Sequence, residues 1–456
     1  MTASTIHKFK FGDLNIVLDV NSGALHVVSE LGGLVIDLVD KGYKEGEIQE
    51  ILTQSHDSRE ITKVYQEVEE LNEKELLFSQ DYTQSYSRSP EHIVKALCFH
   101  MAHDCNMTCS YCFAEKGAFG GTKSLMTREV AFKGIDFLIQ SSGSRKNCEV
   151  DFFGGEPLLN FPLIRETVDY ARNKGKESGK EFSFTLTTNG VLLDMEAMDY
   201  LDQEDFSVVL SLDGRREIND RVRTLKGKGT YDGLVPKYLS FVEKREHKGY
   251  YIRGTYTRYN LDFSEDLKHL AELGFKSISL EPVVASPELP YALQEEDLPA
   301  IYRQYEKIAE LYQEYSGTLK SFSFFHFNLD LSQGPCIKKR LSGCGAGTEY
   351  LALTPEGDLY PCHQFAGINN FLMGNVLKGL CYDPSLYDKF LKVDINSKDE
   401  CRHCWAKFFC GGGCHANAYN FNRDLYRPYS MGCHLEKKRL ECALGLQAYR
   451  RLDREL

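Results

Sequence analysis

Two hydrophobic periods alternate along residues 93 to 315. Short apolar runs of the strand type are separated by longer segments in which apolar residues recur with helical spacing. The apolar runs are 93–99, 149–153, 182–188, 206–212, 251–257 and 277–282. Strands that alternate with helices are typical of parallel βα repeats, and their regular order favours an open barrel over a meander. We therefore predict an α/β fold for this part of the chain.

A different pattern covers residues 1–90. Alternating apolar residues over 14–20 and a second apolar run at 27–28, with a turn between them, predict a β-hairpin. Stripes of apolar residues with helical spacing follow over 31–38 and 61–71. A few strands with about three helices suggest a winged-helix-like module.

The net charge of residues 1–90 limits which classes of partner this module can bind. Residues 1–90 contain 8 Lys and Arg against 16 Asp and Glu, a difference of −8, and the whole chain has a formal net charge of −12. Nucleic-acid binding needs clustered basic residues, so the acidic balance indicates a peptide or protein partner. No apolar run approaches the roughly 18 residues of a membrane span, and the first residues lack a signal-peptide pattern. We expect a cytoplasmic protein that binds neither nucleic acid nor membrane.

Composition also marks the domain boundaries. The polar segment 80–90 predicts a linker, which gives an N-terminal domain at 1–90 and a barrel at 91–315. After a bridging region at 316–343, cysteines and glycines crowd into 344–456. The chain has 15 cysteines, and without an export signal they indicate metal ligation and not disulfides. A small metal-stabilised C-terminal domain is therefore predicted.

The most informative motif is a cysteine triad, Cys105-x3-Cys109-x2-Cys112, directly after the first predicted strand. Loops at this end of βα strands build active sites. An iron–sulfur cube has four irons, so three thiolates leave one iron open for a small molecule, whereas a structural zinc site would need a fourth protein ligand. A zinc loop that borrows a distant cysteine, or chance spacing, are the alternatives.

With its strand context, the triad resembles that of the radical S-adenosylmethionine (SAM) superfamily. The resemblance implies a partial (β/α)6 barrel and a [4Fe-4S] cluster whose open iron is chelated by SAM. It also implies that Glu156 accepts a hydrogen bond from the methionyl amine and that Arg223 pairs with the SAM carboxylate. The implied SAM contacts are Tyr111, Phe113, Gly154, Gly155, Glu156, Thr187, Asn189, Ser211, Asp213 and Arg223. Taken singly, these residues also fit turns, packing or a surface arginine, and Glu281 after the sixth strand is expected in a core or turn role.

A second cysteine pattern fills the C-terminal region and resembles the SPASM domain. The resemblance implies two auxiliary [4Fe-4S] clusters, and hence three clusters in all. One auxiliary cluster would be held by Cys401, Cys404, Cys410 and Cys433, and the other by Cys344, Cys362 and Cys414. The second set is one ligand short, so either Cys336 completes it or the site is open to a substrate cysteine. Two zinc sites are the alternative, and His363 is expected in a supporting or surface position.

The complete domain order resembles the maturases of ribosomally made peptides, in which the first module is a precursor-peptide recognition element. The resemblance is strongest to the thioether-forming sactipeptide type that acts on SCIFF (six-cysteines-in-forty-five-residues) peptides. It implies a cysteine-rich precursor peptide, an external one-electron donor and a sulfur-to-α-carbon crosslink. Strand addition to the small N-terminal sheet would capture the leader of the peptide. The rivals are a sulfatase maturase that makes formylglycine and a non-catalytic metal-binding interaction protein.

Overall fold

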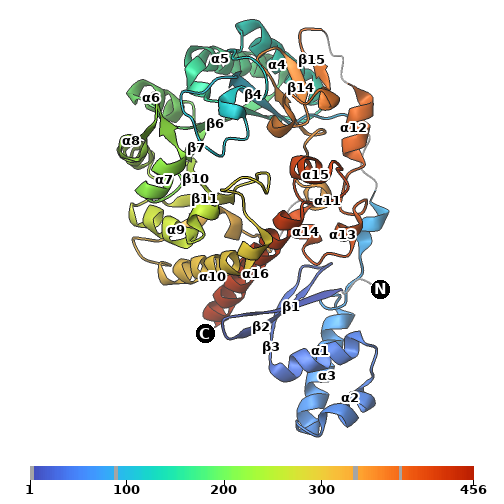
Figure 1. Ribbon diagram of the computed structural model, residues 1–456. Helices are drawn as coiled ribbons and strands as arrows, with labels where there is room; N and C mark the ends of the chain where they lie inside the picture. Colours follow the sequence, from blue (N-terminus) through green and yellow to red (C-terminus); the bar gives the residue numbers. More distant parts are fainter. Residues whose placement is uncertain (1–4, 87–90, 332–336, 379–382, 456) are drawn as a thin grey trace.

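The computed structural model describes residues 5–86, 91–331, 337–378 and 383–455. Figure 1 shows a small N-terminal unit in blue, a barrel from cyan to yellow, and a C-terminal region in orange and red that lies beside both. The predicted Cys336 and the unassigned Cys381 lie outside the described residues. No helix among these segments is long and apolar enough to cross a membrane.

The N-terminal unit is a three-stranded antiparallel sheet with three helices. Its elements are β1 (Ile6–Phe11), β2 (Leu14–Asp19), β3 (Leu25–Val28), α1 (Glu30–Asp40), α2 (Glu45–Leu52) and α3 (Ser58–Glu73). The sheet order is β1-β2-β3, so the predicted hairpin is confirmed as β2 and β3. The sequence analysis missed β1, although Phe9 and Phe11 alternate there with the exposed Lys8 and Lys10. A core of Val35, Ile48, Ile61 and neighbouring apolar residues holds the helices together.

The barrel is built on the parallel strands that the periodicity predicts. They are β4 (Ala96–Ala102), β5 (Asn147–Gly154), β6 (Glu181–Thr188), β7 (Ser207–Ser211), β10 (Tyr250–Tyr256), β11 (Ser277–Pro282) and the short β12 (Ser323–Phe324). Neighbouring strands from β4 to β12 are parallel, in the order β12-β11-β10-β7-β6-β5-β4. The predicted α/β partial barrel is therefore confirmed, with the six predicted strands within three residues of their predicted ends.

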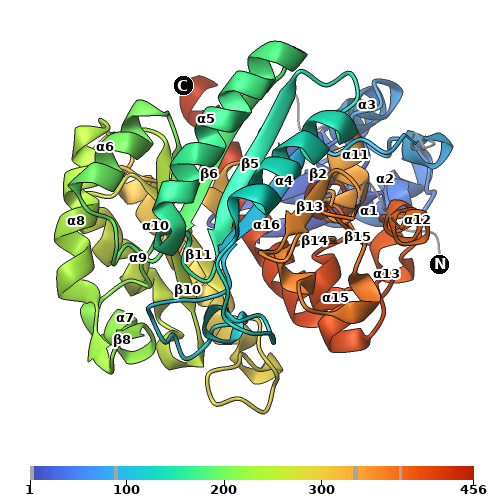
Figure 2. The ribbon, with the colours of Figure 1, turned by 90° about the horizontal axis from the view of Figure 1, so that it is seen from above.

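Helices cover the outer face of this sheet, as Figure 2 shows from above. They are α4 (Arg128–Ser141), α5 (Phe161–Ser178), α6 (Met195–Gln203), α7 (Arg216–Val222), α8 (Tyr231–Lys244), α9 (Phe263–Glu272) and α10 (Leu298–Glu314). A short hairpin, β8 (Thr224–Leu225) and β9 (Lys228–Gly229), lies between α7 and α8. Leucine, valine and aromatic residues from strands and helices form one continuous core, so the strand ends are held on a rigid frame.

The C-terminal region extends the same sheet. Its strands are β13 (Tyr350–Leu353), β14 (Asp358–Tyr360) and β15 (Gly374–Asn375), and β13 pairs in parallel with β4. Its helices are α11 (Ile337–Ser342), α12 (Pro384–Leu391), α13 (Asp399–Arg402), α14 (Lys407–Cys410), α15 (His415–Asn422) and α16 (Ser430–Glu455). The long α16 packs along α10 and touches the N-terminal sheet. The cysteine-rich region is thereby fixed beside the strand that carries the triad loop.

Single 3-10 turns connect these elements. They are η1 (Tyr82–Ser85), η2 (Glu115–Gly117), η3 (Pro157–Asn160), η4 (Arg258–Asn260), η5 (Glu295–Asp297), η6 (Phe325–Phe327), η7 (His363–Phe365) and η8 (Asn369–Phe371). Two of them, η2 and η7, lie next to cysteines of the two motifs, Cys112 and Cys362.

Candidate active site and cysteine centres

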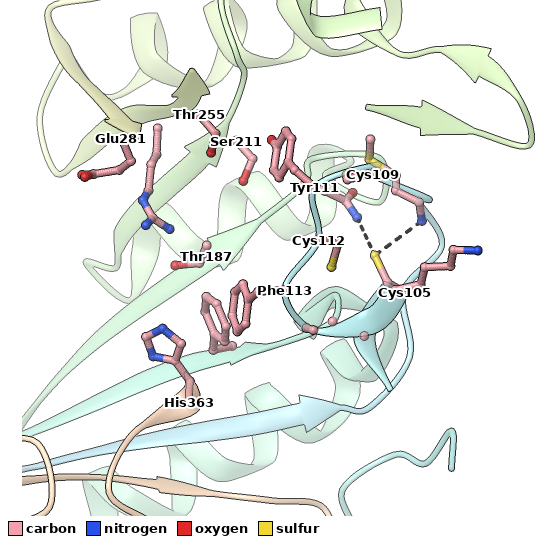
Figure 3. A pocket seen from close by; sticks show the side chains of 18 of the residues that line it. Cys105, Cys109, Tyr111, Cys112, Phe113, Thr187, Ser211, Thr255, Glu281 and His363 are labelled. Carbon is pink, nitrogen blue, oxygen red and sulfur yellow. Dashed lines mark hydrogen bonds between the residues drawn. The ribbon is translucent and has the colours of Figure 1, made fainter. Parts of the chain in front are cut away.

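A cavity of about 310 Å³ lies at the carboxyl ends of the barrel strands. Figure 3 shows that the triad loop forms one wall and that side chains from the following strands face it. The predicted residues that line it are Cys105, Cys109, Tyr111, Cys112, Phe113, Gly154, Gly155, Thr187, Asn189, Ser211 and Arg223. Active sites of parallel barrels form at this edge, so the sequence prediction and the cavity coincide.

The three triad thiols enter the cavity from the loop after β4. The Cys105 Sγ accepts hydrogen bonds from the Met107 amide at 3.4 Å and from the Asn189 amide group at 3.5 Å. Burial raises the pKa of Cys105 to about 12, and it also raises the pKa of Cys109. These two thiols are therefore protonated at neutral pH until a metal displaces their protons.

Glycines hold the turn after β5 against the triad loop. Gly154 has φ +114°, and a Cβ there would lie 2.4 Å from the Ala102 carbonyl oxygen. A Cβ on Gly155 would lie 2.1 Å from the Asp104 carbonyl oxygen. The Gly155 amide donates to Ala102 at 2.8 Å. Only glycine fits this close approach, which packs the backbone of both loops beside the thiols.

Glu156 lies behind the cavity wall with both oxygens engaged. One oxygen accepts from the Thr188 hydroxyl at 2.8 Å and from the Leu158 amide at 3.0 Å, and the other accepts from the Asn189 amide at 2.8 Å. The side chain is fully buried, and burial raises its pKa to about 7. Glu156 thus fixes Thr188 and Asn189, which do line the cavity. Its contact with a methionyl amine stays a prediction.

Asp213 also acts from behind the wall. Its carboxylate accepts the Tyr111 hydroxyl at 2.6 Å, pairs with the Arg223 guanidinium at 3.0 Å and accepts the Thr255 amide at 2.9 Å. Burial opposes the charge of Arg223, but Asp213, together with Tyr111 and Cys109, outweighs burial and holds the pKa of Arg223 well above its usual range. Asp213 therefore holds Tyr111 and Arg223 in place along the cavity.

The C-terminal cysteines gather in two groups. Cys401, Cys404, Cys410 and Cys433 line one cavity of about 30 Å³. Burial raises the pKa of Cys401 to about 11 and that of Cys410 to about 12, and neighbouring cysteines of the same group add to both shifts. Four thiols around one small space form the donor set that a cluster needs.

Cys344, Cys362 and Cys414 form the second group. Burial raises the pKa of Cys362, and the next contributions come from Cys414 and Cys344, so the three thiols are neighbours. Gln364 joins this group to the barrel cavity, because its side-chain amide lies 4.0 Å from the Cys414 Sγ and it also lines the cavity. The three-cysteine group therefore lies beside the barrel cavity.

Comparisons with known proteins agree with this arrangement. A family model described as a 4Fe-4S single cluster domain matches residues 94–235. The mycofactocin maturase MftC of Mycolicibacterium smegmatis is 28% identical over 338 residues, which are 73% of this chain and 81% of that protein. An uncharacterised protein of Methanocaldococcus jannaschii is 32% identical over 191 residues, which are 41% of this chain and 62% of that protein's length.

Two solved structures have the same fold. The enzyme anSMEcpe with bound AdoMet superimposes with a TM-score of 0.66 at 20% identity, over 78% of this chain and 99% of that one. SuiB of Streptococcus suis bound to S-adenosylmethionine superimposes with a TM-score of 0.55 at 17% identity, over 94% of this chain and 98% of that one. This chain therefore has the fold of these two proteins, and its residues 94–235 match the model of a 4Fe-4S single cluster domain.

The barrel cavity contains residues that the sequence reasoning missed or underrated. Arg253, Thr255, Glu281 and His363 all line the barrel cavity. The expected core or turn role of Glu281 and the expected supporting or surface position of His363 stay predictions, although both side chains line the cavity. Burial acts to raise the pKa of Glu281, but the cations around it, His326 first, outweigh burial and hold it well below its usual range. Burial lowers the pKa of His363 to about 4, which keeps its ring neutral.

The donor sets fit the cluster and the SAM that the sequence resemblance implies. Among the residues described, no three Cys, His, Asp or Glu side chains lie close enough together to hold a single metal ion. The triad thiols instead line the wall of a cavity that also contains the polar groups of Thr187, Ser211 and Arg223. A [4Fe-4S] cluster with SAM matches this combination of three thiols, close backbone and hydrogen-bonding side chains.

Proposed function

We propose that this protein installs a thioether crosslink between a cysteine sulfur and an α-carbon in a ribosomally made, cysteine-rich precursor peptide. The observation that supports it is the shared boundary of two centres. The triad cysteines and Gln364 line the same barrel cavity, and Gln364 contacts Cys414 of the three-cysteine group. A peptide in this cavity would have the radical source and a potential thiolate acceptor within one enclosed space.

When bound, the triad cluster and SAM supply a 5′-deoxyadenosyl radical, given one electron from an external donor. Forming the sulfur–carbon bond removes two hydrogens from the peptide. The α-hydrogen leaves as an atom in 5′-deoxyadenosine, the thiol proton leaves to solvent, and one electron remains to be accepted. The group of Cys344, Cys362 and Cys414 would hold the auxiliary cluster that takes this electron.

The chain's own residues orient the reactants and keep water out. Asp213 fixes Tyr111 and Arg223 at the cavity wall, and Glu156 fixes the backbone of Asn189. Such positioning determines which hydrogen of a bound peptide lies next to the radical carbon. We assign Arg223 to the SAM carboxylate, and Tyr111 and Phe113 to its adenine end.

The surroundings of the N-terminal sheet favour a peptide as the substrate. A cavity of about 300 Å³ lies between this sheet and α1, where Val28 and Leu34 give it an apolar wall. The exposed Leu34 and Val27 leave apolar surface next to the edge strand β3. The solved structures of similar fold include SuiB bound to the precursor peptide SuiA. We assign the leader of the substrate to this edge, added as a further strand.

Product mass tests the reaction. The purified protein is incubated without oxygen with SAM, a reductant and a synthetic cysteine-rich precursor peptide. A crosslink predicts a mass loss of two hydrogens and one cysteine that resists alkylation. An aldehyde in place of a cysteine or serine side chain would instead support sulfatase-type maturation, which is the activity named for a relative from Clostridium novyi. An unchanged peptide, with no 5′-deoxyadenosine formed, would contradict both reactions.

A further inference from the structure

Lys398 is a buried lysine for which the described part of the protein offers no carboxylate. Its side chain is fully buried. Its ammonium donates to the Gly412 carbonyl oxygen at 2.6 Å, and it makes no ion pair with any Asp or Glu in the part of the chain that the structure describes. A buried ammonium held by one neutral acceptor is strongly unfavourable unless anionic groups surround it.

The surroundings of Lys398 are the two cysteine groups. Gly412 lines the cavity of the four-cysteine group, and it lies between Cys410 of that group and Cys414 of the other. The Lys398 carbonyl oxygen accepts the Cys401 amide at 3.1 Å. Burial lowers the pKa of Lys398, and the groups that oppose this shift are cysteines of both groups. The ammonium therefore lies against the backbone segment that joins the two centres.

We infer that Lys398 is the counter-cation of the auxiliary clusters, a positioning residue that ties their loops together and raises their reduction potentials. The inference rests on the proposed function, because it needs iron–sulfur clusters at these cysteines. A cluster held by thiolates is anionic and becomes more negative when it accepts an electron. A fixed positive charge nearby favours the reduced state, and the effect is large where water is excluded.

Two other lysines, which line the cavity of the four-cysteine group, show why Lys398 is different. Lys407 pairs with Asp81 at 2.8 Å, so its charge is already balanced by protein. Lys437 lines the same cavity but is partly exposed, so water screens its charge. Lys437→Met is therefore a matched control, since it removes one lysine charge from the wall of the four-cysteine cavity.

The test is an anaerobic redox titration of the auxiliary clusters followed by electron paramagnetic resonance. The full chain carries Cys105→Ala, Cys109→Ala and Cys112→Ala, so that only auxiliary clusters contribute. In this background, Lys398→Met should shift the midpoint potentials to more negative values, and Lys398→Arg should restore them in part. Lys437→Met should produce a much smaller shift. Iron and sulfide content is measured for each variant.

The possible outcomes distinguish a failure of the role of Lys398 from a failure of the proposed auxiliary clusters. Full iron content in Lys398→Met with potentials equal to those of the background protein would overturn the role of Lys398 and leave the clusters intact. A shift no larger than that of Lys437→Met would overturn it too. If Lys398→Met binds little iron, the potentials of Lys398→Arg decide: potentials like those of the background support the inference, and a large negative shift overturns it. A background protein without iron would overturn both the inference and the auxiliary clusters.

Discussion

His7 lies flat on Trp405, with ring centroids 3.8 Å apart and an angle of 3° between the planes. The His7 ring also lies 3.1 Å from the Glu441 carboxylate on α16. Trp405 is the single tryptophan of the chain and directly follows Cys404. Val20 of the N-terminal unit packs in the same cluster as Cys401 and Trp405. The N-terminal unit thus rests directly against the segment that carries the four-cysteine group.

This contact can be followed by fluorescence. His7→Ala removes the ring that covers Trp405, which should shift tryptophan emission to longer wavelength and lower stability by about 1 kcal/mol. His26→Ala is the control, because the His26 ring contacts the Leu76 carbonyl oxygen in the same unit. An emission spectrum of His7→Ala identical to that of the wild type would show that the two rings do not stack in solution.

Replacing Asp213 should lower the stability of the protein more than replacing Tyr111, whose hydroxyl donates to it. Asp213→Asn leaves Arg223 buried without a counter-charge, which costs about 3–5 kcal/mol. Tyr111→Phe removes one hydrogen bond to a charged group, which costs about 1.5–3 kcal/mol. The midpoint of thermal unfolding and the affinity for SAM, measured by equilibrium dialysis, should both fall more in Asp213→Asn than in Tyr111→Phe. Equal losses in the two variants would contradict the assigned ion pair.

Glu156 should leave a signature in the pH dependence of stability. Its pKa is raised by burial from 4.5 to about 7, so the folded chain binds this proton more tightly than the unfolded chain does. The resulting stabilisation is complete below pH 4.5 and is lost as the pH rises through 7, in total on the order of 3 kcal/mol. Glu156→Gln should remove this slope. Denaturant unfolding at several pH values measures how the free energy of unfolding depends on pH. The same pH dependence in the wild type and in Glu156→Gln would refute the raised pKa of Glu156.

Leader binding should depend on the groove that is formed by the cavity between the N-terminal sheet and α1. Leu34→Asp places a charge on the apolar wall of that groove and should weaken leader binding by about tenfold. Ile51→Asp is the matched control, because Ile51 is an exposed apolar residue of the same unit that does not line the groove. Fluorescence anisotropy of a labelled leader peptide gives the affinities. Equal affinities for the two variants would move the leader site elsewhere.

The sequence predicted the barrel well because its signal is local. Each core strand is a short apolar run, and the triad and the GGEP turn directly follow β4 and β5. The strand β1 was not predicted, although its lysines are exposed and alternate with phenylalanines that are partly covered. Local patterns therefore indicated the frame of the site and its cysteine ligands.

Residues brought together by topology could not be predicted in this way. Arg253 and His363 reach the same cavity from segments more than a hundred residues apart, and no local pattern links them. The roles of Glu156 and Asp213 were similarly hidden, since only the folded chain shows that their carboxylates are engaged behind the wall. Lys398 stands in a polar stretch of the sequence, and its burial depends on the loop around Gly412.

The most direct test of the proposed radical SAM site is SAM cleavage by the protein reconstituted without oxygen. With iron, sulfide and a strong reductant, the wild-type chain should convert SAM to methionine and 5′-deoxyadenosine. The variant with alanine at Cys105, Cys109 and Cys112 should form none and should bind about four fewer iron atoms. Zinc in place of iron at this loop, or 5′-deoxyadenosine formed equally by the triple variant, would contradict the assignment.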